Sequence, residues 1–169
     1  MIIVILIFVS YAVAHNKTVV IPLFDSELST PQTQYFTVGS EAFVPWKNVD
    51  YVNAGGNGGA YVDAAGGQAL VAPVHLPHGA EVTEFEVFFD DTSIEDMTVY
   101  LNSQYFSSGY AILAAVNSSG TGGKYSEIDT TILSPIVDNK LKSYLVYAFS
   151  TNWNSSLKIK GAVITYTIE

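Results

Sequence analysis

The sequence predicts an all-β protein, built as a two-sheet antiparallel β-sandwich or jelly roll with an N-terminal β arm. Apolar and polar residues alternate with a period of two in many short stretches, which are separated by Gly, Pro, Asn, Asp and Ser. No stretch has a convincing helical period. Hydrophobic residues make up 49% of the 169 residues and aromatic residues 13%, which is too much apolar surface for a disordered chain.

The first 14 residues, MIIVILIFVSYAVA, are uncharged and indicate an export signal. The run is shorter than the roughly 20 residues that cross a bilayer, and residues 12–14 have the small-x-small pattern of a cleavage site. The positive charge that usually begins such a segment is missing, so a retained anchor, a misplaced start codon and a buried strand are the alternatives. We expect an arm and connection over residues 15–34 and one sandwich domain over residues 35–169, outside the cell or at its surface.

The first expected strands are short and irregular. Residues 19–24 predict a strand in which Pro22 suits an edge position, and a polar connection follows over residues 25–34. Strands are expected at 35–38 and 41–52. The glycine-rich run after them, AGGNGG, permits tight reversals of the chain.

The central block shows the clearest alternation. Residues 69–76 predict an apolar strand that Pro73 interrupts, and a turn leads into a strand at 82–89. In this second strand Glu84 and Glu86 share one face and apolar side chains share the other, so one side should face the core and the other should face water.

The C-terminal half predicts four more strands, at 97–101, 110–116, 143–149 and 157–168. We expect the last two to pair antiparallel across the turn around Trp153. Gly161 breaks the alternation of the final strand, which indicates a β-bulge. About nine short strands with this spacing favour a sandwich or jelly roll over an open sheet.

Charge and cysteine content restrict the partners. The chain has seven basic residues, all Lys, against 16 acidic ones, for a net charge of −9. We expect no nucleic-acid partner, because phosphate binding needs clustered positive charge. Without cysteine, stability must come from packing, backbone pairing or neighbouring subunits. Three sequons, at Asn16, Asn117 and Asn154, are glycan acceptors in a host that glycosylates exported proteins, and are ordinary polar turns otherwise.

No pattern points to catalysis, a metal or a cofactor. The three histidines form no zinc motif, a GxSxG elbow is absent, and the glycine-rich stretches lack the ending of a phosphate-binding loop. The acidic stretch Asp90–Asp96 has oxygen ligands suited to calcium but not the EF-hand spacing, and a solvated turn is the simpler interpretation. We expect no enzyme activity, no cofactor and no metal site.

Two stretches resemble a known type of domain. Residues 72–80 read APVHLPHGA and residues 157–168 read LKIKGAVITYTI. Together with Asp129–Ile132 they resemble a β-sandwich domain common in exported bacterial and archaeal proteins, whose biochemical role is largely uncharacterised. The resemblance covers roughly residues 60–169 and implies an exported sandwich without catalytic residues. The arrangement of the chain is also similar to that of filament subunits in which the N-terminal strand of one copy completes the sheet of the next.

These observations lead to the hypothesis of an exported structural subunit that self-associates into a filament or surface assembly. An extended arm can add to an exposed sheet edge through main-chain hydrogen bonds, and head-to-tail addition produces filaments. The expected partners are copies of the same protein. The residues of this self-association arm are Val19, Val20, Ile21, Leu23 and Phe24.

The alternative hypothesis is a carbohydrate-binding or adhesive module, with glycans or the cell envelope as partners. Its binding platform would consist of aromatic side chains, which in a sandwich more often fill the core. The candidates are Trp46, Trp153, Tyr105, Phe106 and Tyr110.

Overall fold

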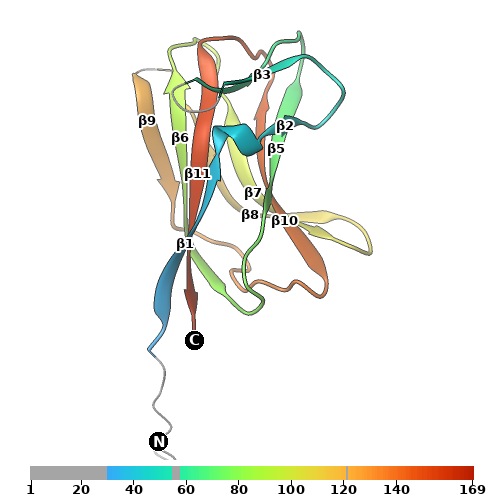
Figure 1. The fold of residues 1–169 in the computed structure, drawn as a ribbon, viewed down its shortest axis with the longest axis vertical. Coiled ribbons are helices and arrows are strands. Elements are labelled where there is room, and N and C mark those ends of the chain that lie inside the picture. The colour runs from blue at the N-terminus through green and yellow to red at the C-terminus, as the bar shows by residue number, and fades with distance from the viewer. Residues whose placement is uncertain (1–29, 55–57, 121) are drawn as a thin grey trace, which may run out of the picture.

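The computed structural model describes residues 30–54, 58–120 and 122–169, and it confirms the predicted fold class (Figure 1). Eleven strands form two antiparallel sheets that pack face to face, and the helical structure in the described residues is one 3-10 turn, η1 (Ser40–Ala42). No helix in these ranges is long and apolar enough to cross a membrane. The predicted export signal, the self-association arm and Asn16 lie outside the described residues.

The first sheet has six strands, in the order β3-β4-β11-β6-β9, and β1 also pairs with β11. Strand β6 pairs along one edge of β11, and β1 and β4 share the other edge of β11. On that shared edge β1 pairs with residues 161–168 and β4 pairs with Ile159. The strands of this six-stranded sheet are β1 (Gln32–Gly39), β3 (Tyr51–Ala54), β4 (Gly59–Val62), β6 (Glu81–Asp91), β9 (Gly123–Asp129) and β11 (Leu157–Ile168).

The second sheet has five strands, in the order β2-β5-β10-β7-β8. They are β2 (Val44–Pro45), β5 (Gln68–Val74), β7 (Thr98–Tyr105), β8 (Tyr110–Asn117) and β10 (Lys142–Ser150). Pairing between β2 and β5 is limited to residues 70 and 71 of β5. Pro73 therefore lies where β5 has no neighbour on that side, which suits a residue without an amide hydrogen.

The expected pairing of the strands at 143–149 and 157–168 is wrong. These segments are β10 and β11, and they belong to different sheets. The connection of residues 151–156 crosses from one sheet to the other, and within it Trp153 is 7% exposed. A connection of this length suits a crossover as well as a hairpin, so its spacing did not distinguish them.

Several strand boundaries also differ from the prediction. The expected strand at 41–52 is divided into η1, β2 and the start of β3, and β1 begins at Gln32, inside the expected connection. The sequence pattern predicted neither β4 nor β9. In β9 most side chains on both faces are at least partly exposed, so its sequence has no apolar alternation to recognise.

The predicted bulge at Gly161 is confirmed. The register between β11 and β6 shifts between Ile159 and Gly161, and as a result Ile159 and Ile164 both point into the core with 0% exposure. A Cβ atom on Gly161 would lie 2.6 Å from the carbonyl oxygen of Val38 on β1. Glycine is needed here because the backbones of β1 and β11 approach so closely.

The alternation in β6 is also confirmed. Phe85, Val87 and Phe89 are buried between the sheets, whereas Glu84 and Glu86 point outward. The same inward alternation in β10 buries Val146 and Ala148. These side chains meet in one continuous hydrophobic core, which holds the two sheets together.

Candidate functional site

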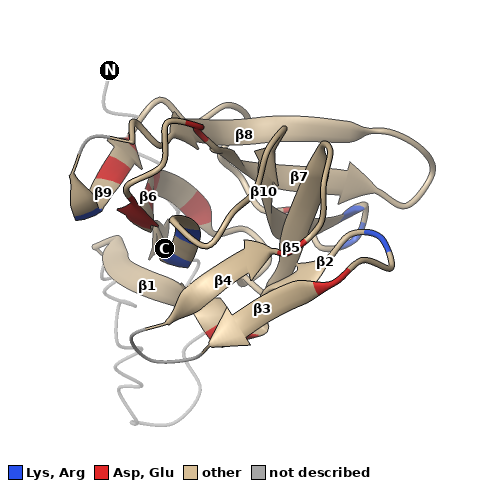
Figure 2. Cartoon of the chain, turned by 90° about the horizontal axis from the view of Figure 1, so that it is seen from above, with Lys and Arg blue, Asp and Glu red and all other residues tan. Residues whose placement is uncertain are grey.

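The outward faces of the two sheets differ in charge. The strands of the five-stranded sheet contain no Asp or Glu, and their one charged residue is Lys142. In the six-stranded sheet, β6 has four carboxylates that are not buried, on Glu81, Glu84, Glu86 and Asp90, and β9 and β11 add further charged residues (Figure 2). Charged side chains keep a sheet face in contact with water. An uncharged face with exposed apolar side chains is typical of a binding surface.

A groove of about 480 Å³ lies on the outer face of the five-stranded sheet. Five of its nine lining side chains are aromatic, and they come from β7, β8, β10 and the residue after β2. We call it the aromatic groove. Its lining residues are Trp46, Tyr100, Asn102, Gln104, Tyr110, Ile112, Leu145, Tyr147 and Phe149.

The pleat of β10 explains why these side chains point outward. Tyr144, Val146 and Ala148 are buried on the inner face, so the residues between them must lie on the outer face. Those residues are Leu145, Tyr147 and Phe149. A solvent-facing strand normally has polar residues at such positions, whereas β10 is apolar on both faces.

The aromatic rings of the groove pack against one another. The Trp46 and Tyr147 rings meet edge to face, with centroids 6.1 Å apart, and Tyr100 lies 6.3 Å from Tyr147 on the other side. The side chains at the rim stay accessible: Trp46 is 54% exposed and Tyr110 71%. The rings of the cluster therefore position one another and still offer apolar surface for stacking.

The hydroxyl of Tyr147 remains a hydrogen-bond donor at neutral pH. Burial raises the pKa of Tyr147 above its ordinary value of 10.0, and Tyr100 and Tyr110 raise it further. A neutral phenol both donates and accepts hydrogen bonds. The groove thus combines apolar rings with a protonated hydroxyl.

Asn102 on β7 is a buried amide without a partner. The residue is 9% exposed, its Oδ1 atom is inaccessible, and its side chain makes no hydrogen bond with any described residue. Leaving such a group unpaired costs about 1–3 kcal/mol. Native proteins rarely accept this cost, so Asn102 is an unusual polar group in the wall of the groove.

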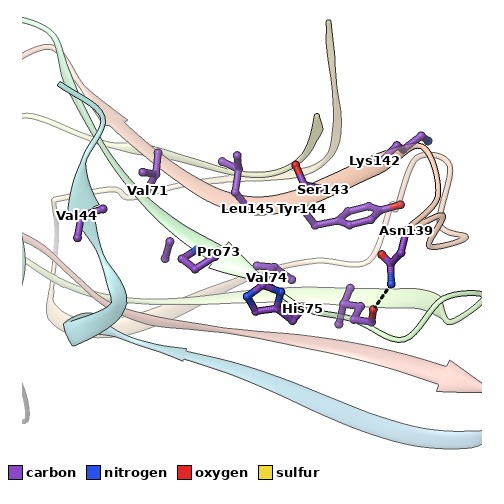
Figure 3. A pocket seen from close by; sticks show the side chains of 12 residues that line it. Val44, Val71, Pro73, Val74, His75, Asn139, Lys142, Ser143, Tyr144 and Leu145 are labelled. Carbon is purple, nitrogen blue, oxygen red and sulfur yellow. Dashed lines mark hydrogen bonds between the residues drawn. The ribbon is translucent and has the colours of Figure 1, made fainter. Parts of the chain in front are cut away.

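A second cavity, of about 470 Å³, adjoins the groove (Figure 3). Its walls come from β2, β5, β10 and the turn before β10, and Leu145 lines both cavities. Pro73 and exposed His75 lie between Val44 at one end and Asn139 at the other. The Nδ2 atom of Asn139 donates a hydrogen bond of 2.8 Å to the carbonyl of Leu76, which holds that end in place.

The structure separates the five aromatic residues singled out from the sequence. Trp46 and Tyr110 line the groove. Tyr105 and Phe106 lie near the β7–β8 turn and are not among the lining residues, and the Lys142 ammonium lies 4.8 Å from the Tyr105 ring centre. Trp153 is in the core, where its Nε1 donates to the carbonyl of Gln68 at 2.8 Å.

Sequence reasoning missed Tyr100, Asn102, Tyr147 and Phe149. One signal could have found part of this set. Residues 143–149 are apolar at nearly every position, which is unnecessary in a strand that has one face toward water.

The other predicted features have structural roles or ordinary surroundings. Asp91, in the acidic stretch, is fully buried, and its carboxylate accepts from the amides of Ser93 at 2.9 Å and Gly120 at 3.2 Å. Across the described ranges, no three His, Asp or Glu residues are grouped so that they could hold a metal ion. Of the described sequons, Asn117 is exposed, whereas the Asn154 Nδ2 atom donates to the Ser93 hydroxyl.

The fold and the groove define a β-sandwich with an exposed aromatic groove on one of its two sheets. No protein-family model matches the chain, and no curated protein matches it. The C-terminal CBM6, a carbohydrate-binding module, of the laminarinase LamC from Zobellia galactanivorans is 15% identical, with a TM-score of 0.48 over 78% of this chain and 99% of that one. The structure of the infectious bursal disease virus Gx strain is 13% identical, with a TM-score of 0.43 over 83% of this chain and 32% of that one.

A third similar structure comes from xylanase 10B of Clostridium thermocellum, whose CBM22-1 and GH10 modules were solved with xylohexaose. It is 13% identical, with a TM-score of 0.40 over 84% of this chain and 29% of that one. Similarity at this level concerns the overall fold alone.

Proposed function

We propose that the protein is a carbohydrate-binding module that acts outside the cell or at its surface, and that the aromatic groove binds a neutral glycan. The observation that carries the proposal is an exposed groove with five aromatic side chains in its lining and no carboxylate. A pyranose ring has apolar C–H faces that stack on aromatic rings, and hydroxyl groups that pair with amides and phenols. The groove offers both kinds of contact.

The shape of the site favours a glycan over a protein partner. A cavity of about 480 Å³ lies within the range of sites for small molecules and short oligomers. Protein interfaces of ordinary stability bury roughly 800 Å² on each side and are flatter. A confined groove with few polar groups in its lining therefore fits a sugar chain better than a protein surface.

The lining of the two cavities supports binding and offers no pair of carboxylates. Most glycosidases place two carboxylates on either side of the scissile bond. Neither of the two described cavities is lined by Asp or Glu. The groove therefore supplies binding contacts but no acid–base pair.

Binding to a panel of soluble and insoluble polysaccharides tests the proposal, by affinity electrophoresis and pull-down. Trp46→Ala and Tyr147→Ala should each weaken binding about tenfold or more, because each removes a stacking surface. Tyr35→Ala is the matched control, since Tyr35 is 68% exposed but lies on β1 of the other sheet. Absence of binding across the panel, or an equal loss in the control, would overturn the proposal.

Self-association through the arm stays a separate prediction, because residues 19–24 lie outside the described residues. The first described strand, β1, already pairs along all of its residues with β11 of its own chain. An arm from another copy would have to add at a different sheet edge. Deletion of residues 15–28 should abolish assembly in size-exclusion chromatography and leave a folded monomer.

A further inference from the structure

We infer that the aromatic groove is one half of a longer cleft, which binds an internal segment of a linear, uncharged glycan lying across the strands of the five-stranded sheet. The other half is the second cavity, lined by Val44, Val71 and Pro73. This inference rests on the proposed function and specifies the ligand of the same site.

Strand register aligns the two cavities. Asn102 on β7 pairs with Leu145 on β10, and Leu145 pairs with Pro73 on β5. Cross-strand partners point to the same face of a sheet, so these three side chains form a row across the strands. The row begins in the aromatic groove and ends in the second cavity, and Leu145 belongs to both.

A second row runs parallel to the first. Tyr100 pairs with Tyr147, Tyr147 with Val71, and Val71 with Val44 on β2. From β8 to β2 the sheet has four strand spacings, or about 19 Å at roughly 4.8 Å each. An extended sugar chain advances by about one strand spacing for each unit, so the cleft has room for about four units.

The chemistry of the two halves fits one ligand. The second half offers an apolar surface, on which the C–H faces of further sugar rings can lie. This surface consists of Val44, Val71, Pro73 and Leu145. Neither half is lined by a carboxylate that would select a cationic ligand. The one charged side chain in the lining is Lys142 of the second half, whose ammonium lies 4.8 Å from the Tyr105 ring centre.

Both ends of the cleft are open. Tyr110 at one end is 71% exposed and Val44 at the other is 47% exposed. A closed end would select the terminus of a glycan chain, whereas two open ends let the chain continue in both directions. The bound segment is therefore internal to the chain.

Calorimetry with an oligosaccharide series tests this inference, using the disaccharide to the hexasaccharide of a polysaccharide that the wild-type protein binds. Affinity should rise with each added unit to about the tetrasaccharide and then level off. Chemical blocking of the oligosaccharide ends should leave affinity unchanged. Saturation at the disaccharide, or dependence on a free end, would overturn the inference.

Val44→Asp places a charge in the second half only. It should weaken hexasaccharide binding about tenfold and leave disaccharide binding unchanged. Pro73→Asp, at an exposed position on the neighbouring strand β5, should weaken hexasaccharide binding to a similar extent. This second variant tests the inference even if Val44→Asp disturbs the two-residue strand β2. Ile128→Asp is the control, because Ile128 is 53% exposed on β9 of the other sheet.

The outcomes separate the two proposals. If neither charge variant affects the hexasaccharide while Trp46→Ala still abolishes binding, the longer cleft is refuted and the aromatic groove stands. If no oligosaccharide or polysaccharide binds at all, the carbohydrate-binding function itself is refuted, and the longer cleft falls with it.

Discussion

Replacing Asn102 with Leu should make the protein more stable and stop it from binding its glycan. The Asn102 amide oxygen is buried without a hydrogen bond, at a cost of about 1–3 kcal/mol. Leucine has a similar size and no polar atom, and its cross-strand neighbours are Ile112 and Leu145. We expect the free energy of unfolding to rise by about 1–2 kcal/mol, and the melting temperature by several degrees.

Two other side chains with a buried, unpartnered polar atom provide the controls. Asn53 also has an unpartnered Oδ1 atom, but its Nδ2 donates to the carbonyls of Glu41 at 3.0 Å and Phe43 at 3.1 Å. Asn53→Leu should therefore destabilise the fold by about 1–3 kcal/mol. The Ser103 hydroxyl is buried without a partner on the core side of β7, so Ser103→Ala should leave glycan binding unchanged and stability equal or higher.

Urea denaturation followed by tryptophan fluorescence measures the stability of each variant, and calorimetry measures binding. The dependence of the unfolding free energy on urea should be the same for all variants, because the surface exposed on unfolding hardly changes. The reasoning would be refuted if Asn102→Leu unfolded at lower urea than wild type, or if it bound glycan with unchanged affinity. Either result would mean that the amide of Asn102 is not held for a ligand.

Three further predictions concern the fold and the pH dependence. Gly161→Ala should destabilise the protein by about 2 kcal/mol or more in urea, because its Cβ atom would lie 2.6 Å from the Val38 carbonyl oxygen. Trp153→Phe should cost about 1–3 kcal/mol through loss of its hydrogen bond to Gln68, with glycan binding intact; a loss of binding would show that Trp153 is not simply a core residue. The pKa of Tyr147 is higher in the folded protein than in the unfolded chain, so its contribution to stability is fully present below the ordinary tyrosine pKa and is lost as pH rises through the folded value. In an absorbance titration of the folded protein, one tyrosine should therefore ionise at higher pH than the others. Tyr147→Phe should lack this late ionisation.

Local features of the sandwich followed from the sequence because each depends on neighbouring residues only. The pleat sends successive side chains to opposite faces, so the alternation around Phe85 and Glu86 identified the core side of β6. Before Gly161 the apolar residues occupy one set of alternate positions, and after it they occupy the other set. A β-bulge at Gly161 brings both sets to the same face of the sheet.

The binding face depended on pairings between distant segments. Trp46, Tyr100, Tyr110 and Tyr147 come from four separate parts of the chain, and the register of β10 with β5 and β7 brings them together. Nothing near Trp46 or Trp153 in the sequence distinguishes the exposed tryptophan from the buried one.

The sequence by itself therefore determined the fold class, the inner face of the clearest strands and the position of the bulge. Only the tertiary structure decided that β10 and β11 lie in different sheets and that the aromatic side chains form one groove. The physical reason is that the direction of a side chain follows from its own strand, whereas its neighbours follow from long-range hydrogen bonding and from the packing of the two sheets.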